Sequence, residues 1–114
     1  MFEWRFYPKH LEHPVTLITE ALKSAVSRGV EVRVLMAHDG SCYELTRMGI
    51  KSKRIYRTGL VHAKVMCIDR SVCVLGSHNY TQAAFTRNLE ISLMVESSDI
   101  AAAFSEYFNA LWGV

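Results

Sequence analysis

Two apolar runs joined by a short polar stretch constrain the fold of this chain more than any other feature of its sequence. Residues 60–80, LVHAKVMCIDRSVCVLGSHNY, contain both runs, and the tripeptide DRS separates them. Polar residues between two strand-like runs are typical of a tight turn, so the segment predicts a β-hairpin. His62 and Lys64 are two residues apart, and on a strand their side chains share one face.

The register of this hairpin depends on the length of its turn. A two-residue loop at positions 70 and 71 sets Lys64 opposite Ser77 and His62 opposite Asn79. On this register four polar side chains gather on one face of an apolar hairpin. A three-residue loop with a bulge would break the register. The alternative interpretation is that His62 and Lys64 are ordinary polar residues at the exposed end of a strand.

The periodic segments on either side of the hairpin predict an α/β fold. Strands are predicted at residues 2–7, 30–36, 51–57 and 90–96, and helices at residues 14–28, 41–49 and 100–111. This order is typical of an α/β sandwich with a mixed β-sheet flanked by helices.

Local signals predict where the first two helices begin and end. Pro14 suits the first turn of a helix, and Gly29 supplies a stop for that helix. Ser41 and Glu44 have the Ser-x-x-Glu spacing of a capping box, which predicts that the second helix begins at Ser41. Gly49 then closes this helix.

Length and composition indicate a single globular unit. The chain has 114 residues, of which half are hydrophobic and 21% are charged, and we expect residues 1–114 to form one domain. The net charge of +2 permits an anionic partner without requiring one. The sequence contains no apolar run of about 18 residues and no signal peptide at its start. Because the chain leads directly into a strand-like segment, we expect a domain truncated at its N-terminus, and we expect a cytoplasmic protein.

The cysteines and histidines do not have the spacing of a metal site. Cys67 and Cys73 fall in the apolar runs of the hairpin, where we expect small buried hydrophobic side chains. Together with Cys42 they make an odd number of cysteines, which does not indicate a disulfide framework. His10 and His13 are three residues apart in a predicted loop, and we expect no metal there.

The ordered polar residues of the hairpin match a known pattern. His62-x-Lys64 followed by Asp69 resembles the HxKxxxxD motif of the phospholipase D superfamily. The sequence GSHN at 76–79 resembles the Gly-Ser-x-Asn continuation of that motif, and NLE at 88–90 resembles its downstream acidic element. The resemblance covers nearly all of the chain and implies a phospholipase D-like half-domain.

The resemblance also implies roles for individual residues. His62 matches the nucleophile that forms a covalent phosphohistidine, and Lys64 matches the cation that neutralises the phosphoryl oxygens. Asn79 and Ser77 would add an amide and a hydroxyl donor. Glu90 matches the acid that hydrogen-bonds the nucleophilic ring and sets its tautomer. We expect no metal ion and no other cofactor, because positive side chains already cover the phosphate.

Three further residues near the motif are expected to act structurally or not at all. Asp69 is five residues from Lys64, so a regular strand points it to the opposite face, where its carboxylate would cap the turn. Gly76 belongs to the structural part of the motif. His78 is offset by one from Asn79, and we expect it to face away from the site.

The chain contains one motif, whereas hydrolysis requires both a nucleophile and a general acid. The resemblance implies either a homodimer with the site on its two-fold axis or one half of a longer protein with two motifs. Our leading hypothesis is a phosphodiesterase acting on nucleic acid. A basic run could hold backbone phosphates beside the site or form a solvated loop, and its members are Lys51, Lys53, Arg54 and Arg57. The alternatives are phospholipid hydrolysis or transphosphatidylation, and a non-catalytic nucleic-acid-binding module of a larger protein.

Overall fold

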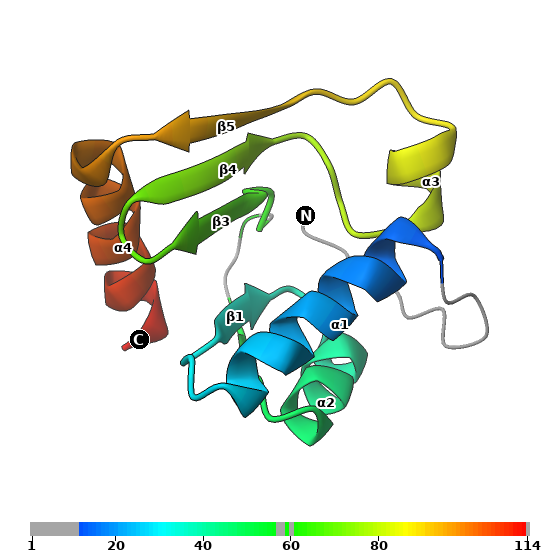
Figure 1. Ribbon diagram of the computed structural model, residues 1–114, viewed down its shortest axis with the longest axis horizontal. Coiled ribbons are helices and arrows are strands. Elements are labelled where there is room, and N and C mark those ends of the chain that lie inside the picture. The colour runs from blue at the N-terminus through cyan, green and yellow to red at the C-terminus, as the bar shows by residue number, and fades with distance from the viewer. Residues whose placement is uncertain (1–11, 57–58, 60, 114) are drawn as a thin grey trace.

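Helices and strands alternate along the chain in a computed structural model that describes residues 12–56, 59 and 61–113 (Figure 1). The expected strand at residues 2–7 lies outside the described residues. The elements, in chain order, are α1 (Pro14–Ser27), β1 (Arg33–Met36), α2 (Asp39–Arg47), β2 (Lys51–Arg54), β3 (Val65–Ile68), β4 (Val72–Gly76), α3 (Gln82–Thr86), β5 (Ser92–Glu96) and α4 (Ser98–Trp112). They confirm the mixed α/β class. The short helix α3 was not predicted.

Both parallel and antiparallel pairing occur among the strands. Within the described residues they form two ladders: β1 pairs with β2 in parallel, and β3, β4 and β5 form an antiparallel ladder in that order. The ladder strands β1 and β5 are shorter than the predicted strands at 30–36 and 90–96, since regular pairing begins only at Arg33 and Ser92.

Apolar side chains from α1, β1 and α2 form the main core. Val15, Met36, Leu45 and Ile50 are buried against one another, and Figure 1 shows α1 and α2 beside β1. Helix α4 packs against β3 and β4. Ala101 of α4 is fully buried, as is Cys73 of β4. The helices therefore cover the strands with apolar side chains.

The second helix begins earlier than predicted. Helix α2 starts at Asp39, so the prediction that a capping box begins the helix at Ser41 is wrong. The N-cap is His38, whose side chain makes no capping hydrogen bond. Asp39 in the first turn places a carboxylate at the positive end of the helix dipole, which favours this earlier start. The predicted end is confirmed, because Gly49 follows the helix with a φ of 84°.

The hairpin is confirmed, but its predicted register is wrong. The turn has three residues, so Ile68 pairs with Val72. Asp69 and Arg70 both have positive φ, at 52° and 53°, and the Ser71 N–H closes the turn on the Ile68 carbonyl at 3.0 Å. The pairing is therefore shifted by one residue from that of a two-residue loop.

This shift changes which residues face Lys64. The Gly76 N–H donates to the Lys64 carbonyl at 3.3 Å, so Lys64 lies opposite Gly76 instead of Ser77. By the same register His62 is not opposite Asn79. The expected gathering of four side chains by direct cross-strand pairing is thus incorrect.

A disulfide links the two strands of the hairpin. Cys67 and Cys73 are directly paired across β3 and β4, and their sulfurs are bonded. Cys73 is fully buried, as expected of a small hydrophobic side chain, but the disulfide between the two cysteines was not predicted. Cys42 is a free thiol, and burial raises its pKa.

Candidate active site

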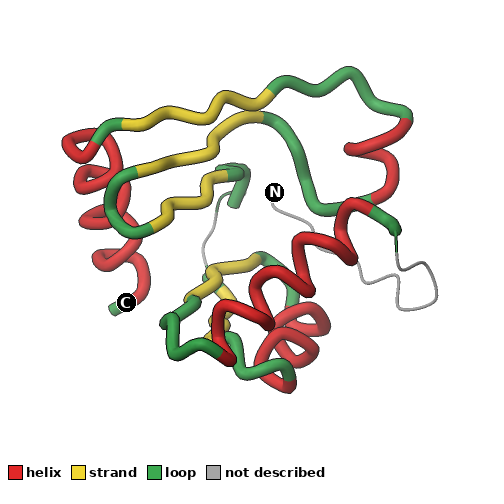
Figure 2. Tube along the Cα trace, viewed as in Figure 1, coloured by secondary structure: helices red, strands yellow, loops and turns green. Residues whose placement is uncertain are grey.

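The motif residues meet at one end of the antiparallel ladder. His62 and Lys64 precede β3, Ser77 and Asn79 follow β4, and Glu90 precedes β5. Because neighbouring strands run in opposite directions, these positions share the end of the ladder that faces α3 (Figure 1). Loops carry the chain from β4 to α3 and from α3 to β5 (Figure 2). We call this end of the ladder the motif end.

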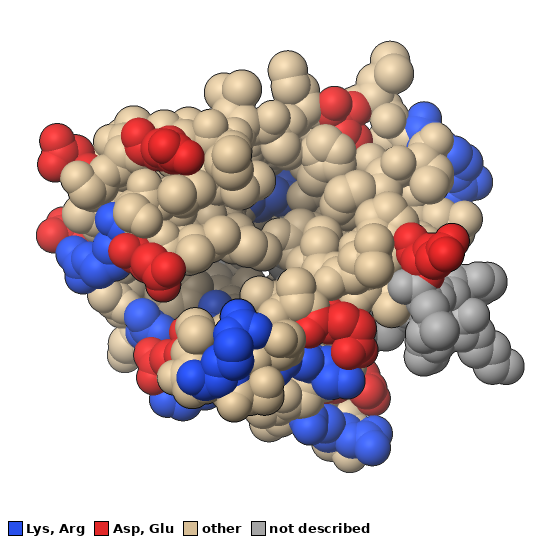
Figure 3. Space-filling view, in the orientation of Figure 1, with Lys and Arg blue, Asp and Glu red and all other residues tan. Residues whose placement is uncertain are grey.

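Lys64 is held close to the backbone of His62. Its side chain is nearly buried, with the residue 8% exposed, and its Nζ donates to the His62 carbonyl oxygen at 2.7 Å. His62 itself is exposed. The positive charge of Lys64 lowers the pKa of the His62 imidazole, which favours the unprotonated ring that a nucleophile needs. Figure 3 shows a hollow in the centre of one face of the molecule, with Lys or Arg atoms at its bottom.

Glu90 and Ser77 form a second polar pair at the motif end. A hydrogen bond from Ser77 is the largest cause of the lowered pKa of the Glu90 carboxyl group, and a hydrogen bond from Asn88 at 3.3 Å lowers it further. Electrostatic interactions with His78 and Lys64 lower the pKa of Glu90 as well. Glu90 is therefore an ionised carboxylate within the electrostatic reach of Lys64. Among the described residues, no hydrogen bond joins this carboxylate to the imidazole of His62 in the same chain.

Gly76 permits a close approach between β4 and β5. A Cβ atom at position 76 would overlap the Ile91 carbonyl oxygen and the Ser92 hydroxyl, and it would lie 2.5 Å from the Ser92 Cα. The next residue continues this contact, since the Ser77 N–H donates to the Ile91 carbonyl at 3.0 Å and the Ile91 N–H donates to the Ser77 hydroxyl at 3.1 Å. Glycine at this position thus allows the segment that contains Ser77 to lie against the segment that contains Glu90.

His78 lies on the Lys64 side of the ladder, contrary to expectation. Its Nδ1 is 2.7 Å from the hydroxyl of Ser92, which is paired with Gly76. Its ring also packs against Phe85 of α3, with centroids 5.2 Å apart. The shifted register explains the difference, because it places even-numbered residues of β4 on the face of Lys64. The contact between His78 and Ser92 was not predicted, because predicting it requires the correct turn length.

Asn79 and Asp69 lie in different parts of the hairpin. Asn79 is half-buried in the loop after β4, at the motif end. Asp69 is exposed in the turn at the far end of the hairpin, and the described hydrogen bonds that close this turn come from Ser71. The turn hydrogen bonds therefore do not include the expected carboxylate cap. The left-handed backbone of Asp69 gives another structural reason for aspartate, which adopts this conformation more readily than most residues.

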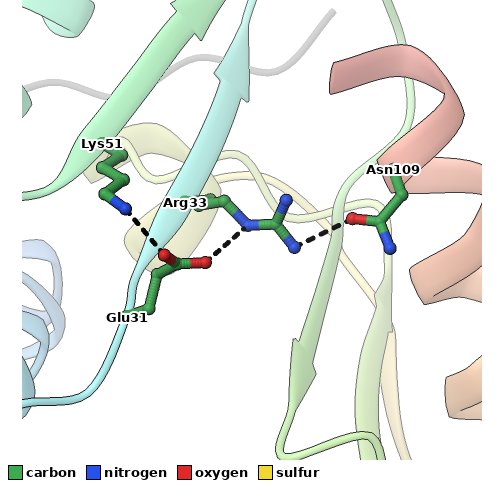
Figure 4. A network of polar contacts seen from close by, with 4 residues as sticks. All are labelled: Glu31, Arg33, Lys51 and Asn109. Atoms are coloured by element: carbon green, nitrogen blue, oxygen red, sulfur yellow. Dashed lines mark hydrogen bonds and ion pairs between the residues drawn. The ribbon is translucent and has the colours of Figure 1, made fainter. Parts of the chain in front are cut away.

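Lys51 belongs to a network of charged side chains within the protein. It forms an ion pair with Glu31 at 2.7 Å, and this pair lowers the pKa of the Glu31 carboxyl group. Figure 4 shows that Glu31 also contacts Arg33, which donates to the Asn109 side chain of α4 at 2.9 Å. The ion-pair partner of Lys51 thus belongs to this network and not to the motif residues.

The other described members of the basic run also have partners within the chain. Lys53 donates to the Trp112 carbonyl oxygen at 2.8 Å, and its ammonium lies 4.7 Å from the centre of the Trp112 ring. Arg54 pairs with Asp39 at 2.5 Å. Arg57 lies outside the described residues. Phosphate binding by this run remains a prediction, and these contacts would compete with it.

Two other features of the described chain bear on the type of site. His13 caps α1 by accepting from the Val15 N–H at 3.1 Å, whereas His10 lies outside the described residues. In the part of the chain that the structure describes, no three His, Cys, Asp or Glu side chains gather as metal ligands do. No helix within that part is long and apolar enough to cross a bilayer.

Comparisons with known proteins agree with this arrangement. A family model described as cardiolipin synthase, PLD-like domain matches residues 5–112. A phospholipase D of Rickettsia conorii is 35% identical over 94 residues, which are 77% of this chain and 47% of that protein. Cardiolipin synthase A of Pseudomonas syringae is 30% identical over 108 residues, or 85% of this chain and 22% of that protein. The chain thus spans about half the length, or less, of these curated relatives.

Two solved structures have a similar fold. The crystal structure of Nuc, a phospholipase D family member from Salmonella typhimurium, superposes with a TM-score of 0.76 and 27% identity, covering 88% of this chain and 70% of that one. NucT from Helicobacter pylori has a TM-score of 0.68 at 22% identity, covering 84% of this chain and 70% of that one, and shows the shared fold.

Proposed function

This chain belongs to the phospholipase D superfamily of phosphodiesterases, and on that premise we propose that it cleaves phosphodiester bonds with His62 as the nucleophile. The observation that carries the proposal is the contact between Lys64 and the backbone of His62 at the motif end. It keeps a cation next to an exposed imidazole whose pKa is lowered, and a phosphate that reaches His62 also meets Lys64.

The reaction proceeds in two steps. An unprotonated ring nitrogen of His62 attacks phosphorus, a bond between nitrogen and phosphorus forms, and the bond to the leaving oxygen breaks. A second, protonated imidazole gives its proton to the leaving oxygen. Water then attacks the phosphohistidine and loses a proton to that second imidazole, which frees His62 and restores the starting protonation states.

Other residues of the motif end stabilise the transition state or orient the ring. Lys64 and Asn79 neutralise or hydrogen-bond the phosphoryl oxygens, and Ser77 supplies a hydroxyl. Glu90 accepts a hydrogen bond from an imidazole and thereby fixes its tautomer. Since these groups cover the charge of the phosphate, we propose that turnover does not require a divalent metal.

The second imidazole comes from another copy of the motif. In this proposal two chains form a homodimer, and each contributes one His62 to a shared site. If the chain is part of a longer protein, a second motif in that protein takes the same role. The absence of a described contact between Glu90 and His62 within one chain is compatible with a site completed by a second motif.

We propose nucleic acid as the first substrate to test. The net charge of +2 and the exposed position of His62 support access for a polyanion. The internal partners of Lys51, Lys53 and Arg54 weaken this support. A phospholipid is the second candidate, favoured by relatives that are named phospholipase D and cardiolipin synthase A.

A substrate comparison in excess chelator tests the proposal. The wild-type chain is incubated with single- and double-stranded DNA, with RNA, and with phospholipid vesicles. We expect cleavage of a nucleic acid by the wild type and no cleavage by His62→Ala. Release of a lipid head group alone would favour the phospholipid candidate, whereas strict dependence on an added divalent metal would contradict the mechanism.

A further inference from the structure

The ring of His78 is fixed on two sides at the motif end. Its Nδ1 lies 2.7 Å from the Ser92 hydroxyl of β5, and its face packs against the Phe85 ring of α3 with the centroids 5.2 Å apart. The residue is half-buried. A ring held by a hydrogen bond and by an aromatic neighbour keeps one orientation, so its other nitrogen, Nε2, has a defined direction.

The Nε2 atom of His78 is directed away from β5. The hydrogen-bonding directions of the two imidazole nitrogens diverge widely, so a ring whose Nδ1 faces Ser92 turns Nε2 to the opposite side. In the ladder β5 flanks one side of β4, and β3 flanks the other. Lys64 precedes β3, and its carbonyl accepts from the Gly76 N–H, two residues before His78. Nε2 therefore faces the half of the motif end that carries Lys64.

His78 also belongs to the polar surroundings of Glu90. The His78 ring and the Lys64 ammonium both act electrostatically on the Glu90 carboxyl group and lower its pKa. The two side chains thus lie within electrostatic reach of the same carboxylate. In the part of the chain that the structure describes, the hydrogen bond of the His78 ring is the one at Nδ1. The Nε2 side of the ring therefore remains for a ligand at the motif end.

We propose that His78 is a further substrate-binding residue, which donates a hydrogen bond from Nε2–H to an oxygen of the bound phosphodiester; this inference rests on the proposed function. The Ser92 hydroxyl donates to Nδ1, so the proton of the neutral ring is on Nε2. Lys64 neutralises the charge of the phosphate, and His78 adds a directed donor. Ser92 is then a positioning residue, because it sets the tautomer of His78. The recognised group, a phosphoryl oxygen, is common to nucleic acids and phospholipids.

Three variants of His78 separate substrate binding from a purely structural contact with Ser92. His78→Asn places an amide near the position of Nδ1, whereas the amide of His78→Gln reaches the position of Nε2. His78→Phe keeps the packing on Phe85 and loses both nitrogens. His38→Phe, at the exposed N-cap of α2, is the matched control. Each protein is assayed in excess chelator with a nitrophenyl phosphodiester, an oligonucleotide and phospholipid vesicles, and denaturation checks its stability.

We expect His78→Gln and His38→Phe to stay within about threefold of the wild-type kcat/KM, and His78→Asn and His78→Phe to lose about tenfold. The loss should be mainly a higher KM, because the ground state and the transition state share this contact. It should appear with every substrate that the wild type cleaves, since each of them contains the phosphate. Comparing the oligonucleotide with the vesicles shows which of the two sources supplies the phosphodiester.

An NMR titration of the histidine rings tests the contact without turnover. It uses the His62→Ala chain with isotope-labelled ring nitrogens, and inorganic phosphate is the probe. We expect the proton of the neutral His78 ring on Nε2, and a shift of the Nε2 signal as phosphate is added. Ser92→Ala should lose the preference for this tautomer. These results would support His78 even if His62 forms no phosphohistidine, so failure of the proposed nucleophile and failure of this inference are distinguishable.

Three results would overturn this inference. The first is a His78→Asn variant that keeps the wild-type KM while His78→Gln does not, because the ring would then serve only the contact with Ser92. The second is a folded His78→Phe variant with wild-type kinetics. The third is a His78 ring in His62→Ala that inorganic phosphate leaves unchanged, or whose neutral form carries its proton on Nδ1.

Discussion

The Lys64 ammonium donates to the backbone carbonyl of His62 at 2.7 Å, and its charge lowers the pKa of the imidazole on the same residue. The same side chain therefore favours the unprotonated form of the neighbouring ring and, in the proposed site, provides positive charge for a phosphate. This relationship joins the electrostatics of the motif end to the proposed nucleophile.

Replacing Lys64 with Met should raise the pKa of His62 toward its ordinary value of 6.5. The wild-type imidazole loses its proton at lower pH than the variant, so the acid limb of the activity profile should move upward in Lys64→Met. Turnover should also fall about a hundredfold, as when an oxyanion donor is removed. An NMR titration of the His62 ring checks the pKa.

The exposed Lys23 of α1 provides the control for this titration. Lys23→Met should leave both the His62 titration and turnover unchanged. A His62 titration in Lys64→Met that matches the wild type would contradict the electrostatic coupling.

Gly76 should not tolerate a methyl group. The added Cβ of Gly76→Ala overlaps the Ile91 carbonyl and the Ser92 hydroxyl, and forcing these segments apart should cost about 1–3 kcal/mol of unfolding free energy. Gly40→Ala is the control, because its Cβ meets nothing within 4 Å and alanine favours the helix α2. Chemical denaturation measures both variants, and equal stability would refute the close approach.

Asp69 should matter for the turn and not for the chemistry. Asp69→Val places a β-branched residue at a φ of 52° and should lower the unfolding free energy by about 1–2 kcal/mol relative to Asp69→Gly. Thermal denaturation measures this difference. Asp69→Gly should remain active, and a folded but inactive Asp69→Gly would instead assign the carboxylate a role in the site.

Reduction of the Cys67–Cys73 disulfide should destabilise the hairpin that carries the motif. For a sequence separation of six, loop entropy predicts a loss of about 2 kcal/mol. Denaturation with and without a thiol reductant measures the loss, and Cys42→Ser should respond to the reductant as the wild type does. A stability that the reductant leaves unchanged would argue against the disulfide.

The sequence predicts elements better than it predicts register. Helix α1, helix α4 and the hairpin follow from apolar periodicity, which reflects burial on one face. The turn length does not follow from periodicity. Asp69 and Arg70 both adopt positive φ, and the resulting third turn residue shifts every pair in the hairpin. The contact of His78 with Ser92 depends on that shift, so sequence reasoning assigned His78 to the wrong face.

Contacts between residues far apart in the chain also could not be predicted from the sequence. The family resemblance implied that His62, Lys64 and Glu90 act in one site, and the structure places all three at the same end of the antiparallel ladder. The partners of the basic run come from distant positions, such as Asp39 for Arg54 and Trp112 for Lys53. Only the packing of the tertiary structure brings these groups together.

The most direct test of the central claim is to trap the covalent intermediate on His62. A phosphodiester substrate labelled in its phosphate is mixed with the protein and quenched rapidly. We predict acid-labile, base-stable label on the wild type and on His38→Ala, a variant of the exposed histidine at the N-cap of α2, and no label on His62→Ala. Turnover without labelled wild-type protein, or label that persists on His62→Ala, would contradict the account.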